Sequence, residues 1–455
     1  MFATDDTIVA VATPMGMGGI GVVRVSGPKA TSIAEAILRP RAPLQPRFVT
    51  LKSVLNPHDG STLDQVLVTF FLGPASYTGE DVLEISGHGN PVLLREIVKA
   101  ALMTGARLAE PGEFTFRAYL SGRLDLVQAE AVGDLVEAVT PLQARVAFDQ
   151  LEGTLTEVVS QIDRTLFDLI ARLEASLDFP DEGYHFVAPG TVSGEIHSLL
   201  DRITRLLGEA GQGRLIREGC QVVILGSPNV GKSTLFNQLL GVSRAIVTDV
   251  AGTTRDLLTE TAEIAGIPTT LVDTAGLRKT TDAIEAEGVA RARKALKVSA
   301  LTVVVLDRSV PLREDDRSLL SETTDTQRLV VINKVDLPAC WLPSDVPELE
   351  KAAVLNVSLV GQDGAREVRT ELGKLLSRDK TLRDAPTISN IRHIKLLELA
   401  TKALTEATAA ADLGADEEFV LSDLQEARLA LEEISGKRTP SAVMEKIFSQ
   451  YCIGK

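Results

Sequence analysis

The sequence has 455 residues, which at roughly 150 residues per domain predicts two or three domains. Its composition, 44% apolar and 24% charged, is that of a folded protein and excludes wholesale disorder. The 47 Lys and Arg residues against 62 Asp and Glu give a net charge of −15, which excludes a broadly basic nucleic-acid-binding surface. Any contact with RNA must be a local patch or be shared with a partner.

Cysteine usage and the first residues indicate the compartment. Three cysteines, with no CxxC pair and no cluster of His and Cys, cannot form a disulfide framework or a structural zinc site. The opening MFATDDTIVAVATP has two Asp and no Lys or Arg, which is unlike a secretory or transit peptide. Apolar runs such as 301–306 are far shorter than the roughly 18 residues of a membrane span. We expect a soluble cytoplasmic protein without a membrane segment.

Residues 1–118 predict an α+β domain. Runs of β-branched or alternating residues predict strands, and two amphipathic patterns predict short helices. The second helix opens with a proline, which suits a first helical turn. The predicted strands are Thr7–Val11, Ile20–Val25, Gln65–Phe71 and Val82–Ile85, and the predicted helices are Thr31–Leu38 and Pro91–Met103.

Residues 119–215 predict long helices. From Leu124 the apolar residues repeat every 3.6 positions, and similar spacing continues past Leu173. A stretch rich in Pro, Gly and acidic residues, Phe179–Gly190, interrupts the pattern before another helix that ends near Ile216.

Residues 216–380 alternate short apolar runs with helical segments, which predicts a parallel sheet with helices on both faces. The predicted strands are Gln221–Leu225, Thr269–Val272, Leu301–Leu306, Leu329–Ile332 and Ala353–Val357.

Residues 381–455 are again helical, and Thr439-Pro440 predicts the cap and first turn of a last helix. We expect the two helical blocks to pack into one discontinuous domain, with the α/β unit inserted in it. The chain ends of such a unit usually lie close together, so an insertion is easy. The alternative is a separate, small C-terminal bundle.

The motif Gly226-Ser-Pro-Asn-Val-Gly-Lys-Ser233 follows a predicted strand and opens a helix. It fits G-x-x-x-x-G-K-[ST], in which backbone N–H groups and a helix N-terminus bind phosphates. Lys232 is expected to contact the β- and γ-phosphates, and Ser233 to bind Mg²⁺. Asp273-Thr-Ala-Gly276 ends a strand near the metal, and Thr253-Thr254 can supply a second hydroxyl to it.

Asn333-Lys-Val-Asp336 follows another strand and predicts the base. A carboxylate accepts two N–H bonds from guanine, whereas adenine offers no such pair of donors and would leave the carboxylate unpaired. Ser358 could complete the base loop, although Leu359 stands where these proteins more often have Ala. Together the motifs resemble a Ras-like P-loop GTPase domain. The residues expected to bind GTP are Asn229, Val230, Gly231, Lys232, Ser233, Thr234, Thr248, Asp249, Val250, Ala251, Gly252, Thr253, Thr254, Asp273, Thr274, Ala275, Gly276, Asn333, Lys334, Asp336 and Ser358.

One position departs from the Ras-like pattern. Leu277 stands where Ras-like proteins carry a Gln that orients the attacking water, so another group must do this. The charge on the β- and γ-phosphate oxygens also needs a cation, and no arginine in the chain is an evident candidate. Asn229 could offer its carbonyl to a monovalent cation in that place.

Beyond these motifs, the chain resembles the MnmE (TrmE) family of tRNA-modification GTPases from end to end. The resemblance includes four segments outside the GTPase motifs: MGMGGIGVVRVSG (15–27), SYTGEDVLEISGHGNP (76–91), EPGEFTFRAYLSGRLDLVQAEAVGDL (110–135) and CIGK (452–455). It implies an N-terminal tetrahydrofolate-binding and dimerisation domain, a helical domain made of both chain flanks, and an inserted G domain. It also implies a homodimer that forms a heterotetramer with the FAD-dependent partner MnmG.

The resemblance further implies an activity. Together with MnmG, the family adds an aminomethyl-type group (carboxymethylaminomethyl) to C5 of the wobble uridine, U34, of certain tRNAs, with a one-carbon unit from 5-formyl- or methylene-tetrahydrofolate. GTP hydrolysis in the family is stimulated by K⁺ and by pairing of the two G domains.

Matched by position, the family's functional residues fall on this chain in four groups. The K⁺ site corresponds to Asn229, Thr248, Val250 and Thr253, and the Mg²⁺ ligands to Ser233 and Thr254. The acidic residue that positions the water corresponds to Glu285, and the folate contacts to Arg24, Glu84, Arg123 and Lys455. Cys452 would lie near the folate and could take part in the modification.

Other interpretations remain open at this level. The chain could be an Era-like regulatory GTPase in ribosome assembly, although no KH module with a GxxG loop is visible after residue 384. It could instead be a folate-binding dimer whose G domain only signals. Cys452 could be a small apolar residue at a helix end, whereas a prenylation signal fits its sequence poorly.

Overall fold

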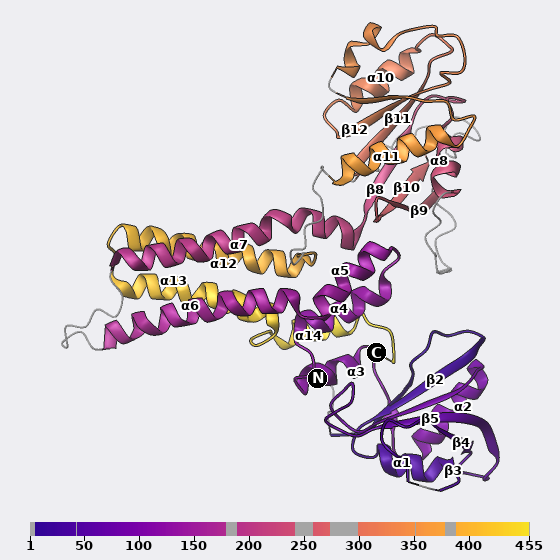
Figure 1. The fold of residues 1–455 in the computed structure, drawn as a ribbon, viewed down its shortest axis with the longest axis vertical. Coiled ribbons are helices and arrows are strands. Elements are labelled where there is room, and N and C mark those ends of the chain that lie inside the picture. The colour runs from indigo at the N-terminus through magenta and orange to yellow at the C-terminus, as the bar shows by residue number, and fades with distance from the viewer. Residues whose placement is uncertain are drawn as a thin grey trace. The chain divides into compact units, whose positions relative to one another are not determined.

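The structure, a computed structural model, describes residues 5–41, 43–178, 189–241, 258–273, 299–350, 352–377 and 388–454. The chain forms two compact units, each built from separate stretches of sequence (Figure 1). One unit comprises Met1–Gly133, Phe148–Ile203 and Lys395–Lys455, and the other comprises Asp134–Ala147 and Thr204–Ile394. The chain therefore leaves the first unit, forms most of the second, and returns.

A seven-stranded sheet forms the N-terminal part of the first unit. Its strands follow the order β3-β4-β5-β6-β2-β1-β7, and neighbours are antiparallel except β1 and β7. The four predicted strands and both predicted helices are confirmed, while β3, β4 and β7 were not predicted. The elements are β1 (Ile8–Val11), β2 (Gly18–Ser26), α1 (Ala30–Ile37), β3 (Leu38–Arg39), β4 (Thr50–Leu55), β5 (Thr62–Phe71), β6 (Val82–Gly89), α2 (Pro91–Met103), β7 (Arg107–Leu108) and α3 (Glu113–Leu120).

The two faces of this sheet differ because successive side chains of a strand point to opposite faces. Val23 and Val25 of β2 are fully buried in a core with Ile33 of α1 and Ile97 of α2. Arg24, between the two valines, is only partly buried. The helices therefore cover one face, and Arg24 lies on the other.

Helices from both flanks of the chain pack together in the first unit (Figure 1). Arg428 of α13 (Glu417–Ser435) pairs with Asp163 of α6 (Thr154–Asp178) at 3.2 Å, across 265 sequence positions. Ser193 of α7 (Pro189–Glu218) donates a 2.7 Å hydrogen bond to Asp412 of α12 (Ile391–Asp412), across 219 positions. These contacts confirm the discontinuous helical domain and exclude a separate C-terminal bundle. Among the described helices, none is long and apolar enough to cross a membrane.

The helical pattern that starts at Leu124 is divided into three helices rather than continued. They are α4 (Leu126–Glu137), α5 (Pro141–Leu151) and α6. Pro141 opens α5, since a proline ring fits a first turn but blocks a helix interior. Gly153 adopts φ +87° immediately before α6, a conformation that does not continue a helix.

The start of the last helix, α14 (Ser441–Phe448), also differs from the prediction. Pro440 occupies the N-cap position, one residue earlier than a first-turn proline. The hydroxyl of Thr439 donates instead to the carbonyl of Glu433 at 3.1 Å, so the predicted Thr439 cap is wrong.

A six-stranded sheet forms the centre of the second unit, in the order β13-β12-β11-β8-β10-β9. All neighbours are parallel except β9, which pairs antiparallel with β10. The expectation of a wholly parallel sheet is therefore wrong at this edge, where Ala265 and Gly266 form a tight turn with φ of +52° and +81°. The elements are β8 (Cys220–Leu225), α8 (Lys232–Gly241), β9 (Leu258–Ile264), β10 (Ile267–Asp273), β11 (Leu301–Asp307), α10 (Glu314–Glu322), β12 (Arg328–Asn333), β13 (Ala353–Asn356) and α11 (Asp363–Ser377).

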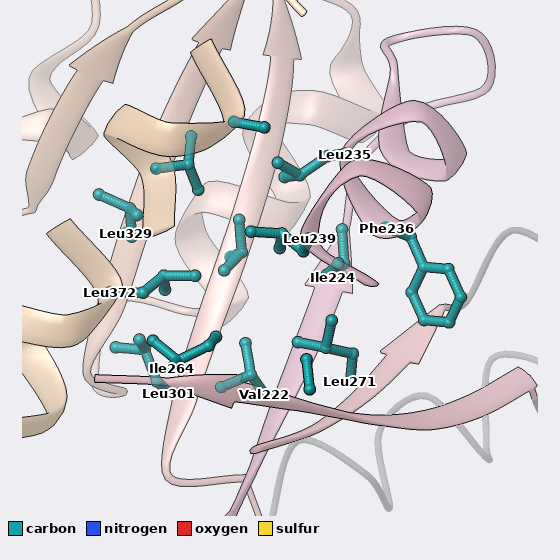
Figure 2. Close-up of a cluster of buried hydrophobic side chains, with 14 of the residues drawn as sticks. Val222, Ile224, Leu235, Phe236, Leu239, Ile264, Leu271, Leu301, Leu329 and Leu372 are labelled. Atoms are coloured by element: carbon teal, nitrogen blue, oxygen red, sulfur yellow. The ribbon is translucent and has the colours of Figure 1, made fainter. Parts of the chain in front are cut away.

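Helices cover both faces of this sheet, as predicted. Figure 2 shows Leu239 of α8 and Leu372 of α11 in one buried cluster with Ile224 of β8. On the other face, Leu320 of α10 packs with Val304 of β11. Because parallel strands end at the same edge, the residues that follow β8, β10, β11 and β12 meet there, and this edge carries the candidate site.

Candidate functional site

The phosphate loop, residues 226–233, connects β8 to α8 by a turn that requires glycine. Gly226 and Gly231 have φ of +150° and +109°. A Cβ atom on Gly226 would lie 2.3 Å from the carbonyl oxygen of Val305, and one on Gly231 would lie 2.4 Å from Nδ2 of Asn333. Any larger residue would displace the loop, which ends on the N-terminus of α8, a position suited to a phosphate.

The groups that would contact phosphate and metal follow directly. Lys232 is buried, and its Nζ donates a 2.8 Å hydrogen bond to the carbonyl of Ser227 in the same loop. Ser233 Oγ donates to Oδ2 of Asp273, at the end of β10, over 3.3 Å. A hydroxyl and a carboxylate side by side fit Mg²⁺, which takes oxygen ligands and usually shares them with substrate phosphates. The residues present therefore fit the predicted Mg²⁺ and GTP.

The base loop is assembled from two segments. Asn333, buried at the end of β12, accepts a 3.0 Å hydrogen bond from the N–H of Leu359. Ser358 Oγ donates a 2.5 Å hydrogen bond to Oδ1 of Asp336. Asp336 is exposed, so its carboxylate can accept N–H bonds from a guanine. The structure thus brings Ser358 to Asp336, as the sequence predicted.

Asp307 at the end of β11 supports this loop, although it stands in no motif that predicts its role. Its carboxylate accepts a hydrogen bond from Nζ of Lys334 and two from Ser309. Burial raises the pKa of Asp307, but these bonds outweigh it, so the pKa lies below its ordinary value. The carbonyl of Asp307 also accepts a 3.0 Å bond from Nε1 of Trp341.

A second unpredicted contact fixes the phosphate loop from outside. The buried hydroxyl of Ser227 donates a 2.6 Å hydrogen bond to Oδ1 of Asp316 on α10. The other oxygen of Asp316 accepts from the N–H of Arg313 at the start of that helix. Ser227 and Asp316 are 89 positions apart, and only the fold brings them together.

Several predicted site residues lie outside the described part of the chain. For nucleotide, Mg²⁺ and K⁺ these are Thr248, Asp249, Val250, Ala251, Gly252, Thr253, Thr254, Thr274, Ala275 and Gly276. Leu277, Glu285 and Lys455 lie outside it as well. Asn229 is described: it is exposed and has φ +66°.

Two of the predicted folate residues are direct neighbours in the N-terminal sheet. Arg24 of β2 and Glu84 of β6 are cross-strand partners, and Nε of Arg24 donates to Glu84 Oε1 at 2.9 Å. The guanidinium lies 5.4 Å from the ring centroid of Tyr77 and 5.7 Å from that of Phe114. Both ends of the pair are partly exposed, so a cation and a carboxylate meet on an accessible surface, next to Tyr77 and above the fully buried ring of Phe114.

A buried ion-pair network holds the segments next to this pair. The carboxylate of Glu113 is fully buried and accepts hydrogen bonds from Arg107 and Arg117. Arg117 also contacts Asp6 and Glu80. Burial raises the pKa of Glu113, but the two guanidinium groups and the N–H of Glu110 lower it further, to below its ordinary value. The network thereby joins the segments 76–91 and 110–135, which the sequence singled out as unusual.

The C-terminal residues lie against the same sheet. Gly454, at φ +99°, packs so closely on β1 that a Cβ atom would lie 2.3 Å from the carbonyl of Val11. The carbonyl of Cys452 accepts a 3.5 Å hydrogen bond from Gly112, and its thiol is free and exposed. Arg123 is exposed too. No contact in the described residues joins the side chains of Arg123 or Cys452 to the Arg24–Glu84 pair.

Comparison with known proteins gives full-length relatives. The family described as "GTP-binding protein TrmE N-terminus" matches residues 7–123, and the "MnmE helical domain" family matches residues 126–452. A protein named "tRNA modification GTPase MnmE" from Koribacter versatilis is 40% identical over 455 residues, which is 99% of each chain. Proteins of the same name from Streptococcus pneumoniae, covering 99% of each chain, and Lactiplantibacillus plantarum, covering 99% of this chain and 98% of its own, are 38% identical.

Proposed function

The chain belongs to the MnmE family of tRNA modification GTPases, and on this basis we propose that it binds and hydrolyses GTP in the course of modifying tRNA. One observation carries the GTPase part: a single edge of the sheet holds the phosphate loop, the Ser233–Asp273 pair and the Asp336–Ser358 base loop. An Era-like role in ribosome assembly would not explain why residues 7–123 and 126–452 match the N-terminal and helical families.

Calorimetry with the full chain tests nucleotide choice. We expect uptake of GTP and GDP in the presence of Mg²⁺, and no measurable uptake of ATP, because a carboxylate at the base edge finds no pair of donors on adenine. Equal binding of ATP would refute the proposal.

Hydrolysis is proposed to need a monovalent cation held by Asn229, Thr248, Val250 and Thr253, with Mg²⁺ on Ser233 and Thr254. The exposure of Asn229 supports this, since its side-chain carbonyl in the phosphate loop is free to approach a cation, and its φ of +66° is one that asparagine adopts more readily than most residues. Turnover should be much faster in KCl than in NaCl at equal ionic strength. Equal rates in the two salts would exclude the cation.

Glu285 is proposed to position the attacking water in place of the missing Gln. Glu285→Ala should bind GTP as the unchanged chain does and lose most of its hydrolysis. Glu322→Ala, a change of another acidic residue in the same domain, is the matched control and should keep full turnover. Unchanged turnover of Glu285→Ala would contradict the role.

The N-terminal domain is proposed to bind 5-formyl- or methylene-tetrahydrofolate through Arg24, Glu84, Arg123 and Lys455. The Arg24–Glu84 pair supports this, because a pterin offers amide donors to a carboxylate and the glutamyl tail attracts cations. Glu84→Ala should abolish binding of 5-formyl-tetrahydrofolate without changing GTP affinity. Cys452→Ser should keep this binding and lose tRNA modification if the thiol takes part in it.

We further propose a homodimer formed through the N-terminal domain, whose bounds we place at 1–118. Leu51 and Leu67, which are cross-strand partners on the sheet face opposite α1 and α2, are 64% and 48% exposed and support an interface there. Leu51→Glu should halve the mass measured by light scattering, whereas Leu399→Glu, on an exposed position of α12, should not.

The remaining parts of the proposal concern the cell. We place the helical domain at 119–215 with 381–455, and the inserted G domain at 216–380. The protein would act with MnmG in the cytoplasm to place a carboxymethylaminomethyl-type group on U34. Mass spectrometry of tRNA nucleosides from cells without this gene should show loss of that modification. A full set of modified wobble uridines would exclude the tRNA role, while the calorimetric test of GTP binding would be unaffected.

A further inference from the structure

A cavity of about 560 Å³ lies in the N-terminal domain, away from both sites described above. It is lined by α1, β4, β5 and the segment that follows β3, and its apolar walls include Leu38, Leu44 and Phe70. Its volume is within the range of small-molecule sites, roughly 300–1,000 Å³.

The cavity lies on the opposite face of the sheet from Arg24 and Glu84. Lys52, which lines it, pairs with Val66 in the register of β4 and β5, and Val66 belongs to the core beneath α1 and α2. Arg24 alternates with core valines and so points the other way. A ligand of this cavity would therefore not share the proposed folate site.

Lys52 is an unusual residue for this face, since the strand pattern calls for an apolar side chain. It is 4% exposed, and its Nζ donates a single 2.8 Å hydrogen bond, to the carbonyl of Pro40. An ammonium group has three N–H donors, and a carbonyl does not neutralise its charge. No carboxylate in the described residues pairs with it. A buried charge without a counter-ion is costly, and an anion in the adjoining cavity would relieve that cost.

The charges of the lining also limit the ligand. Besides Lys52, the cavity is bordered by Glu35 and Arg41, both exposed, so its lining carries one net positive charge. One negative charge on the ligand balances it, and the apolar walls require an apolar body. We propose that this cavity binds a small organic monocarboxylate, with its carboxylate against Lys52 and its body between Leu38, Leu44 and Phe70.

The test is binding of a panel of aliphatic and aromatic carboxylates of about 10 to 15 non-hydrogen atoms, a size that such a cavity accepts. Each is compared with its neutral carboxamide, by ligand-observed NMR on the full chain. At least one carboxylate should bind at least about tenfold more tightly than its amide, because only the anion pairs with the buried ammonium. If no carboxylate binds, or if acids and amides bind equally, the proposal is wrong.

Variants assign the binding to the cavity. Lys52→Met removes the charge and keeps most of the length of the side chain, and it should lose the tenfold preference, with GTP binding unchanged. Lys99→Met, which removes an exposed lysine of α2, should keep the preference. Should Lys52→Met fail to fold, Leu44→Trp, which fills the cavity from a partly exposed position, must abolish binding. Retained binding in Leu44→Trp, or a retained preference in a folded Lys52→Met, would overturn the proposal.

Discussion

Asn333 donates a 2.8 Å hydrogen bond from its buried Nδ2 to the carbonyl oxygen of Val230. Its Oδ1 accepts from the N–H of Leu359, so one side chain joins the phosphate loop to both segments of the base loop. The two ends of the nucleotide site are therefore held at a fixed separation by a single amide.

Replacing this amide should weaken GTP binding without removing any group that contacts the nucleotide phosphates. Asn333→Ala leaves the carbonyl of Val230 and the N–H of Leu359 without their partner, at a cost of about 1–3 kcal/mol each. We expect GTP affinity, measured by calorimetry, to fall at least about tenfold, which is 1.4 kcal/mol. Asn356→Ala, at the exposed end of β13, is the control and should bind GTP normally.

Gly231→Ala should have a larger effect than Asn333→Ala, on stability or on GTP binding. Its φ of +109° is unfavourable for any L-residue, and the new methyl group would meet Nδ2 of Asn333 at 2.4 Å. We expect loss of at least about 2 kcal/mol in unfolding free energy or GTP binding, since the contact lies against a buried, hydrogen-bonded side chain. Gly211→Ala on α7, where nothing lies within 4 Å of the added Cβ, should be neutral or slightly stabilising. If Gly231→Ala had the stability and the GTP affinity of the unchanged chain, the phosphate loop would have to adopt another conformation.

Asp336→Asn should change base choice. An amide cannot accept both N1–H and N2–H of guanine, so GTP affinity should fall by a factor of about 100 or more, as expected when a hydrogen-bonding site loses its match. Xanthosine triphosphate, which carries an oxygen at C2, should bind this variant better than it binds the unchanged chain. Asp325→Asn changes another exposed acidic residue of the second unit and is the control. It should keep the GTP affinity and the base selectivity of the unchanged chain. Unaltered selectivity in Asp336→Asn would place the base elsewhere.

The Glu113 network predicts a pH dependence of stability. Because the folded-state pKa of Glu113 is lower than its unfolded value of about 4.3, its contribution is complete above that pH. It is lost as the pH falls through the folded-state pKa. Glu113→Gln should cost about 1–3 kcal/mol at pH 7, since it removes the buried carboxylate that accepts hydrogen bonds from both guanidinium groups, which keep Asp6 and Glu80 as acidic partners. Urea unfolding between pH 7 and pH 3 should then show a shallower acid slope for Glu113→Gln than for Glu96→Gln, a change at a partly exposed residue.

Local patterns predicted much of this fold. The strands of both sheets follow apolar alternation or buried apolar runs, and the phosphate loop is specified by eight consecutive residues. The sequence did not reveal β3 and β7, because two residues are too few to show a period. Helix α3 was missed since most of its side chains are buried, so it lacks the polar face that marks an amphipathic helix.

In the sites, too, the residues within a local motif could be predicted, whereas contacts between distant positions could not. Asp336 and Ser358 could be assigned because each sits in a recognisable motif. The support given by Asp307 to Lys334 and by Asp316 to Ser227 depends on pairs 27 and 89 positions apart, which no local pattern connects. For Arg24 and Glu84 the resemblance named the residues, and the strand register explains why they meet.

Trp341 is the sole tryptophan in the sequence, and its indole nitrogen is bonded to the carbonyl of Asp307, whose carboxylate accepts from Lys334. The intrinsic ultraviolet emission of the whole chain therefore has one indole source, located directly behind the guanine-recognition loop. Stopped-flow recording of that emission can follow occupancy of the loop in real time, with no dye attached and no other indole to subtract.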